Sequence, residues 1–91
     1  MAEIIKTDGM RQPVQPANGT DFTLEEMQAI VGGDIELVFL NETEIMVVNE
    51  EGKINDLAYN PAATHIFKEN HPGVSDYIVG DVLVCNDEQI K

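Results

Sequence analysis

The chain has 91 residues and a formal net charge of −12, from 17 acidic and 5 basic side chains. This length suits a single domain with a modest core. Because the chain has so few basic side chains to form a phosphate-binding patch, direct nucleic-acid binding is not expected. The single cysteine, Cys85, excludes an internal disulfide and fits a reducing compartment. We expect neither a signal peptide nor a membrane span, because no apolar stretch is long enough.

Residues 2–16 predict a weak N-terminal β-hairpin. A short apolar strand is followed by Asp8-Gly9, a pair typical of hairpin turns. Pro13 and Pro16 cannot donate to a ladder, so the returning strand is expected at the edge of a sheet.

Residues 24–31 predict a short helix. Thr23 and Glu26 have the spacing of a capping box, and Gly32 suits the left-handed position after a helix end. The helix is too short to form alone, so packing must hold it in place. Its apolar stripe consists of Leu24, Met27, Ile30 and Val31.

Residues 35–54 predict a β-hairpin. Residues 34–40 alternate between acidic and apolar, and residues 45–48 are rich in β-branched side chains. Gly52 stands where a bulged turn favours a left-handed residue. After it we expect an extended segment with Ile54 and Leu57 pointing inward.

The C-terminal third predicts a helix over 61–70, a strand over 77–85 and a polar tail over 86–91. Asn60 is a favoured helix cap, and Pro61 is tolerated at the first helical position. Residues 82–85 are apolar on both faces, which is typical of a central strand, and Gly80 indicates a bulge or a close backbone approach.

These elements predict a single domain of the α+β class. We expect a mostly antiparallel sheet of four to five strands with two short helices packed against it, because neighbouring strands are joined by hairpin-type links.

The residue types needed for catalysis or metal binding do not form a motif. The single serine, Ser75, falls in a predicted loop, and Cys85 lies in an apolar strand where a thiol stays inert. His65 and His71 are six residues apart, which does not place them on one helical face. We therefore expect no enzyme activity, no cofactor and no metal site.

Four polar residues are candidates for binding: Asn49, Lys53, Tyr59 and Asn60. A cation, an aromatic face and amides on one rim could hold a small polar ligand or a partner's backbone. The structural alternative is that Asn49 belongs to a tight turn, that Asn60 begins a helix, and that Lys53 lies against Glu50 or Glu51.

Between Asp21 and Asp56 there are ten acidic residues and one base, Lys53. This acidity either aids solubility or forms a surface for a basic partner or for imitation of DNA phosphates. The candidate acidic surface comprises Glu25, Glu26, Asp34, Glu36, Glu42, Glu44, Glu50 and Glu51.

Three segments resemble a known family: residues 24–38 (LEEMQAIVGGDIELV), 49–60 (NEEGKINDLAYN) and 76–84 (DYIVGDVLV). They are similar to domain-of-unknown-function family 3846, small proteins of phages, plasmids and conjugative elements. The chain departs from the family pattern in having residues 57–59 in place of a Gly-X-Pro, and in a shorter helix after Asn60. The family has no established biochemical activity to carry over to this chain; what the resemblance implies is a mobile element in the cytoplasm of a bacterial host.

The leading hypothesis is a small non-catalytic binding protein of a phage or mobile element that acts on a host protein. One alternative is an acidic DNA mimic that inhibits a host restriction or DNA-processing enzyme. Another is a sponge for a nucleotide-type signalling ligand. Self-association is also allowed, because uncovered strand edges can pair.

Overall fold

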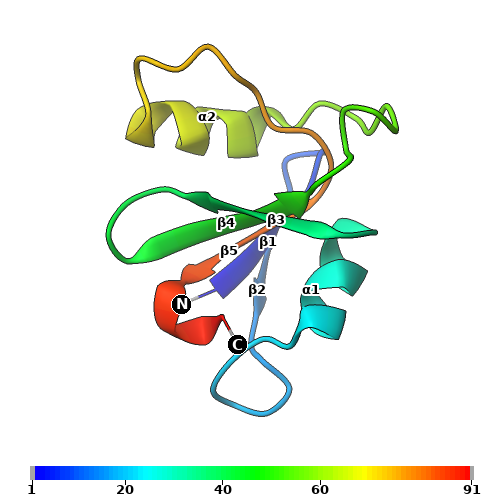
Figure 1. The fold of residues 1–91 in the computed structure, drawn as a ribbon, viewed down its shortest axis with the longest axis vertical. Coiled ribbons are helices and arrows are strands. Elements are labelled where there is room, and N and C mark those ends of the chain that lie inside the picture. Colours follow the sequence, from blue (N-terminus) through cyan, green and yellow to red (C-terminus); the bar gives the residue numbers. More distant parts are fainter. Residues whose placement is uncertain (1, 91) are drawn as a thin grey trace.

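The computed structural model describes residues 2–90 and shows one five-stranded antiparallel sheet with a helix on each face (Figure 1). The strand order is β2-β1-β5-β4-β3. This arrangement confirms the predicted α+β class. In chain order the elements are β1 (Ala2–Ile5), β2 (Arg11–Val14), α1 (Leu24–Val31), β3 (Ile35–Phe39), β4 (Glu44–Asn49), α2 (Pro61–Asn70), β5 (Val82–Asn86) and the 3-10 helix η1 (Asp87–Gln89).

Strand β5 is the central strand, and its two faces belong to two separate core clusters. Val82 and Val84 face the α2 side, where Ala63 and Phe67 cover them. On the α1 side, the cluster contains Leu83, Cys85, Met27, Val31 and Phe22. Side chains alternate across a strand, so a strand that is apolar at every position needs a cover on both faces. The position predicted for residues 82–85 is therefore the one observed.

Helix α1 begins at the capping box that the sequence predicts. The Thr23 hydroxyl accepts a hydrogen bond from the Glu26 amide at 3.2 Å, and the Glu26 carboxylate accepts one from the Thr23 amide at 2.9 Å. The same carboxylate also accepts from the Ala17 amide at 2.9 Å. The helix ends at Gly32, whose φ of 82° is the left-handed conformation that glycine adopts without strain.

Helix α2 is connected to the sheet by its N-cap residue, Asn60, which is fully buried. The Asn60 side-chain oxygen accepts from the Ala63 amide at 3.0 Å. Its amide nitrogen donates to the carbonyls of Ile5 and Gly80, at 3.0 and 2.9 Å. One side chain therefore joins the start of the helix to the end of β1 and to the segment before β5.

The N-terminal hairpin forms as β1 and β2, and β2 lies at one edge of the sheet. The Lys6 amide donates to the Met10 carbonyl at 2.8 Å, next to the turn. Hydrogen-bonded and non-hydrogen-bonded pairs alternate along an antiparallel ladder, so the Glu3–Pro13 pair, three pairs further on, is non-hydrogen-bonded. The nitrogen of Pro13 therefore faces the open edge, where a missing donor breaks no ladder bond.

The segment after β4 differs from the prediction. The hairpin ends at Asn49 rather than at residue 54, and residues 50–56 form turns in place of the extended segment expected after Gly52. The expectation that Ile54 points inward was wrong, because the residue is 80% exposed. Gly52 does not have the predicted left-handed backbone. It is needed for space, because a Cβ atom there would lie 2.8 Å from Val79 Cγ2.

The C-terminal region also differs from the expected strand over 77–85. Strand β5 covers Val82–Asn86, and Val79 makes only an isolated bridge with Tyr59. The chain turns at Gly80, whose φ is 77° and where an added Cβ would lie 2.8 Å from Leu57 Cδ1, so the predicted close approach is found. The predicted polar tail contains η1 with its own capping box at Asn86, and its last residue, Lys91, lies outside the described residues.

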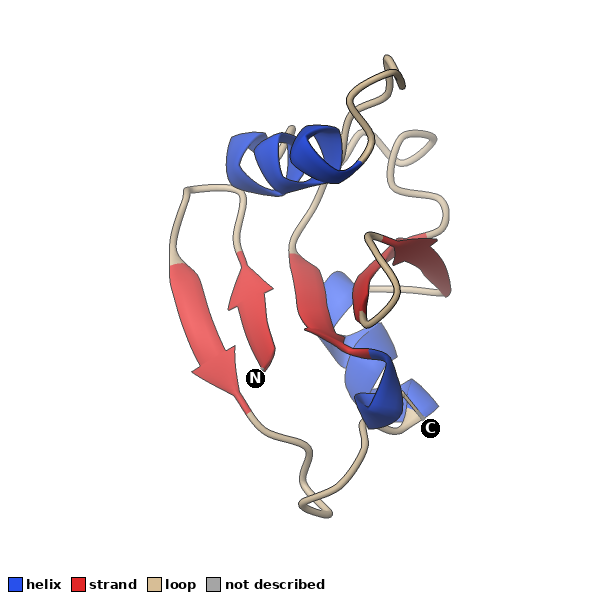
Figure 2. Cartoon of the chain, turned by 90° about the vertical axis from the view of Figure 1, so that its left-hand side faces the viewer, coloured by secondary structure: helices blue, strands red, loops and turns tan. Residues whose placement is uncertain are grey.

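Figure 1 shows α2 above the sheet and α1 below it, and in the turned view of Figure 2 α2 lies across the top of the strands with α1 behind them. None of the helices within residues 2–90 is both long enough and apolar enough to cross a membrane.

Candidate functional site

A cleft of roughly 160 Å³ opens on the α2 side of the sheet. Four parts of the chain surround it: the β3–β4 hairpin, the turns after β4, helix α2 and the segment before β5. The lining residues are Glu36, Val38, Val48, Asn49, Glu50, Lys53, Ile54, Phe67, Asp76, Tyr77, Ile78 and Val79.

The inner wall of the cleft is apolar. Val48, Phe67 and Ile78 belong to the buried cluster between the sheet and α2, and Val38 packs against that cluster. An aliphatic side-chain stem that entered the cleft would therefore contact hydrocarbon at its base.

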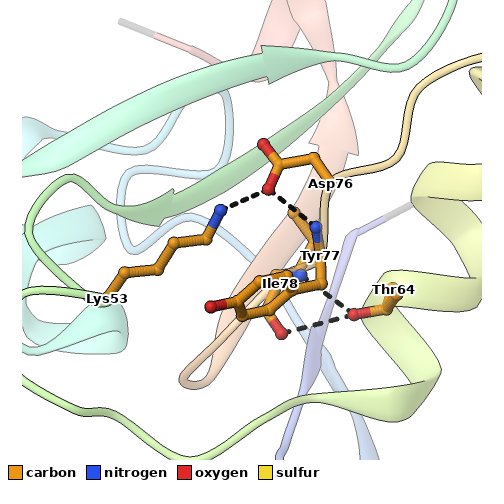
Figure 3. A network of polar contacts seen from close by, with 5 residues as sticks. All are labelled: Lys53, Thr64, Asp76, Tyr77 and Ile78. Atoms are coloured by element: carbon orange, nitrogen blue, oxygen red, sulfur yellow. Dashed lines mark hydrogen bonds and ion pairs between the residues drawn. The ribbon is translucent and has the colours of Figure 1, made fainter.

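The mouth of the cleft carries three carboxylates and one ammonium group. Glu36 comes from β3, Glu50 from the turn directly after β4, and Asp76 from the segment before β5. Lys53 donates a hydrogen bond to Asp76 Oδ1, and its Nζ lies 4.3 Å from the centroid of the Tyr77 ring (Figure 3). With all four groups charged, an excess of negative charge remains at the mouth.

The pKa of Asp76 is lowered from its usual value. The main cause is the hydrogen bond from Lys53, and the backbone amide of Tyr77, which donates to Asp76 at 2.8 Å, adds to it. Both interactions favour the charged carboxylate. Asp76 is therefore ionised at neutral pH and holds the Lys53 ammonium beside the aromatic ring.

The segment that carries Asp76 and Tyr77 is fastened to α2 through Thr64. The Thr64 hydroxyl accepts from the Ile78 amide at 2.9 Å and donates to the Ile78 carbonyl at 3.3 Å (Figure 3). The same carbonyl also accepts a hydrogen bond from the backbone amide of Asn60 at 2.9 Å. These bonds are buried, so they fix the position of a segment that has no regular secondary structure.

Large side chains stand exposed beside the cleft. Tyr77 and Tyr59 have ring centroids 6.1 Å apart and are both about half exposed, and Ile54 is almost fully exposed. Exposed aromatic and aliphatic groups around a charged cleft are typical of surfaces that contact a ligand or a partner.

The four residues predicted for binding do not come together at one rim. Asn49 and Lys53 line the cleft. Asn49 is buried, donates to the Val31 carbonyl at 3.1 Å and accepts from the Glu51 amide at 2.9 Å. Asn60 is the buried cap of α2, and Tyr59 meets the cleft only through Tyr77.

The structural alternative expected Lys53 to lie against Glu50 or Glu51. Lys53 pairs with Asp76 instead. Sequence reasoning did not single out Asp76, Tyr77 or Phe67. Lys53 and Asp76 are 23 residues apart and belong to two irregular segments, so no local pattern connects them.

The eight acidic residues singled out in the sequence lie on both sides of the sheet. Glu36 and Glu50 line the cleft on the α2 side, whereas Glu25 and Glu26 lie in the first turn of α1 on the other side. The Asp34 and Glu44 carboxylates accept side-chain bonds from Gln28 and Asn41. The remaining two, Glu42 and Glu51, are exposed in turns.

The groups that could support other chemistry lie apart from one another. Burial raises the pKa of the Cys85 thiol to about 11. His65 lies 3.5 Å from Glu69 on α2, and His71 Nε2 lies 2.7 Å from the Phe39 carbonyl oxygen, to which it must donate. Within residues 2–90, no three His, Cys, Asp or Glu side chains come together to hold a metal ion.

The chain was compared with protein families, with curated proteins and with solved structures. Neither the curated proteins nor the solved structures give a match. One family model matches residues 2–90, and its description is "Domain of unknown function (DUF3846)". Because this match extends over almost the whole chain, the protein belongs to the DUF3846 family.

Proposed function

We propose that this DUF3846 protein is a non-catalytic binding module that holds a positively charged segment of a partner protein in the cleft on the α2 side. The observation that carries the proposal is the Lys53 ammonium, which lies between the Asp76 carboxylate and the Tyr77 ring. An ammonium group is thus already held at this site by a carboxylate and an aromatic face, the two groups that bind cations best in proteins.

The charge balance of the cleft supports a basic ligand. Glu36 and Glu50 have no cationic partner among the ion pairs of the described residues, whereas Asp76 is matched by Lys53. A lysine or arginine from outside could place its charge between the two unmatched carboxylates and its aliphatic stem against Val38 and Val48. This combination favours a protein segment over a free metal ion, because the wall is hydrocarbon.

The expected partner is a protein of a bacterial host, and the expected setting is the cytoplasm of a cell that carries a phage or another mobile element. Both follow from the family resemblance and are part of the proposal. The overall charge of −12 would also steer a basic partner toward the protein and speed association at low salt.

The two alternatives have less support. A nucleotide sponge would need cations for phosphate, but Lys53 is paired with Asp76 and the cleft has two further carboxylates. A DNA mimic would need its carboxylates in rows on one surface, but Glu25 lies on α1 at one side of the sheet and Glu36 lines the cleft on the other side.

The experiment is a titration of a labelled peptide in which lysine and valine alternate, followed by fluorescence anisotropy at low salt. Glu36→Gln and Glu50→Gln should each weaken binding about two- to fivefold, the effect of one exposed ion pair. The matched control is Glu25→Gln, which removes the same charge from the α1 side and should leave the affinity within about twofold. Equal losses in all three variants, or no binding by the wild-type protein, would overturn the proposal.

A further inference from the structure

The outer edge of β3 has backbone groups that no strand of the described chain pairs. β3 is the last strand of the sheet, and its partner is β4. The Glu50 amide donates to the Asp34 carbonyl at 2.8 Å, and the Leu40 amide donates to the Glu44 carbonyl at 2.9 Å. In an antiparallel ladder, hydrogen-bonded pairs alternate with non-hydrogen-bonded pairs, so the backbone groups of Glu36 and Val38 also bond to β4.

The residues between them therefore point their backbone groups away from the sheet. These residues are Ile35, Leu37 and Phe39. The contact of His71 Nε2 with the Phe39 carbonyl oxygen agrees with this geometry, because that oxygen would be inaccessible inside the ladder. Three outward N–H groups and two outward C=O groups remain for an incoming strand.

The two edges of the sheet differ in how they are protected. At the β2 edge, one of the two outward nitrogens, that of Pro13, carries no hydrogen, so a pairing strand would miss a donor there. β3 contains no proline in its five residues, and its Phe39 is 62% exposed. Natural sheets usually block such an edge, so the open edge of β3 indicates a surface for pairing with another chain.

We propose that the β3 edge pairs with an extended segment of the partner protein in which basic and apolar residues alternate. This inference rests on the proposed function, because the cleft and the edge are continuous: Glu36 and Val38 belong to both. On the cleft side of an added strand, basic residues would lie beside Glu36, with Glu50 one strand further in on the same side of the sheet. On the α1 side, apolar residues would lie beside Leu37 and the exposed ring of Phe39.

Charge decides between this partner and a second copy of the chain. A second β3 would bring another Glu36 to the side of the sheet that already carries Glu36 and Glu50, and its chain would add a further net charge of −12. Like charges on neighbouring strands are destabilising, whereas lysine or arginine at the same positions would be attracted.

The direct test is amide hydrogen exchange followed by NMR, with and without the alternating lysine–valine peptide. The amides of Ile35, Leu37 and Phe39 should exchange at least about fivefold more slowly when the peptide is bound. Those of Glu36 and Val38, already in the ladder with β4, serve as the internal control and should change less. Protection of the three outward amides without peptide, rising with protein concentration, would overturn the inference in favour of a second copy.

A pair of variants at one position isolates the backbone contribution. Phe39→Pro removes an outward N–H without breaking a bond to β4, whereas Phe39→Ala loses the same exposed ring and keeps the N–H. We expect Phe39→Pro to bind the peptide at least about threefold more weakly than Phe39→Ala, with both variants retaining the far-ultraviolet circular dichroism of the wild type.

The outcomes separate this inference from the proposed function. Equal affinities for the two Phe39 variants, together with a loss in Glu36→Gln, would mean that the cleft binds the peptide without strand pairing, and would overturn the inference alone. If the peptide does not bind at all, the proposed function fails as well. An N-methylated peptide that binds as tightly as its parent would also contradict strand pairing.

Discussion

Asn60 connects three parts of the fold through one side chain. It is fully buried and bonds to three backbone groups from three separate parts of the chain. Removing the amide leaves the Ile5 and Gly80 carbonyls and the Ala63 amide without these partners, and each unsatisfied buried group costs about 1–3 kcal/mol.

We expect Asn60→Ala to lower the free energy of unfolding by about 3 kcal/mol or more, measured by urea denaturation. Asn55→Ala is the matched control, because that residue is exposed in a turn; it should change stability by less than about 0.5 kcal/mol. Similar losses in the two variants would contradict the role assigned to Asn60.

Gly52 tests a second contact at the scale of single residues. Its backbone is in an ordinary region, so an alanine would suffer from crowding against Val79 Cγ2, not from backbone strain. We expect Gly52→Ala to lower the free energy of unfolding by about 1–3 kcal/mol, which is seen as a lower thermal midpoint. Gly73→Ala, where an added Cβ meets no atom within 4 Å, should leave it nearly unchanged, and an equal loss at Gly73 would argue against the crowding.

Among the secondary-structure elements, α1 has a start that depends on pH. The pKa of Glu26 is lowered by the hydrogen bond from the Thr23 amide first, and by the one from the Ala17 amide next. A carboxylate with a lower pKa in the folded than in the unfolded protein adds stability above its unfolded pKa. This stability is lost as the pH falls through the folded pKa.

Replacement of Glu26 by glutamine should therefore weaken the dependence of stability on pH on the acidic side, below the ordinary pKa of a glutamate. The measurement is the thermal midpoint across that acidic range for Glu26→Gln and for Glu25→Gln. Glu25 lies in the same turn and makes no hydrogen bond of this kind among the described residues, so it should keep the wild-type slope. Identical slopes for Glu26→Gln and the wild type would show that the capping box does not titrate with folding.

The elements also show which features a sequence can predict. Helix α1, from its capping box to Gly32, and the Asn60-Pro61 start of α2 were predicted because each signal lies within a few residues of its partner. The segments after β4 and before β5 were not, because their conformation depends on distant contacts. Gly52 is fitted against Val79, and Gly80 against Leu57.

At the scale of the whole molecule, the layered arrangement was predictable and the cleft was not. Strand β5 is apolar on both faces, which indicates a cover on each side, and the sheet has one. The cleft arises where four segments meet, and its ion pair joins residues from two irregular segments that no periodic pattern relates. Only Glu36, Asn49, Glu50 and Lys53 among its lining residues were candidates from the sequence.

The central claim is that the cleft binds ammonium groups of a partner. In the wild type the partner's cation lies beside Glu36 and Glu50, and Lys53 fills a second cation position between Asp76 and the Tyr77 ring. Replacing Lys53 with methionine keeps an unbranched side chain but frees Asp76 and the Tyr77 ring. Lys68→Met removes the same charge from an exposed position in the last turn of α2 and is the matched control.

The measurement that tests this claim most directly is the affinity of the alternating lysine–valine peptide for these two variants at equal salt. We predict that Lys53→Met binds about fivefold more tightly than the wild type, the combined effect of one cation–aromatic contact and one exposed ion pair, while Lys68→Met changes by less than about twofold. Equal gains in both variants would reduce the effect to overall charge, and no gain in Lys53→Met would contradict the claim.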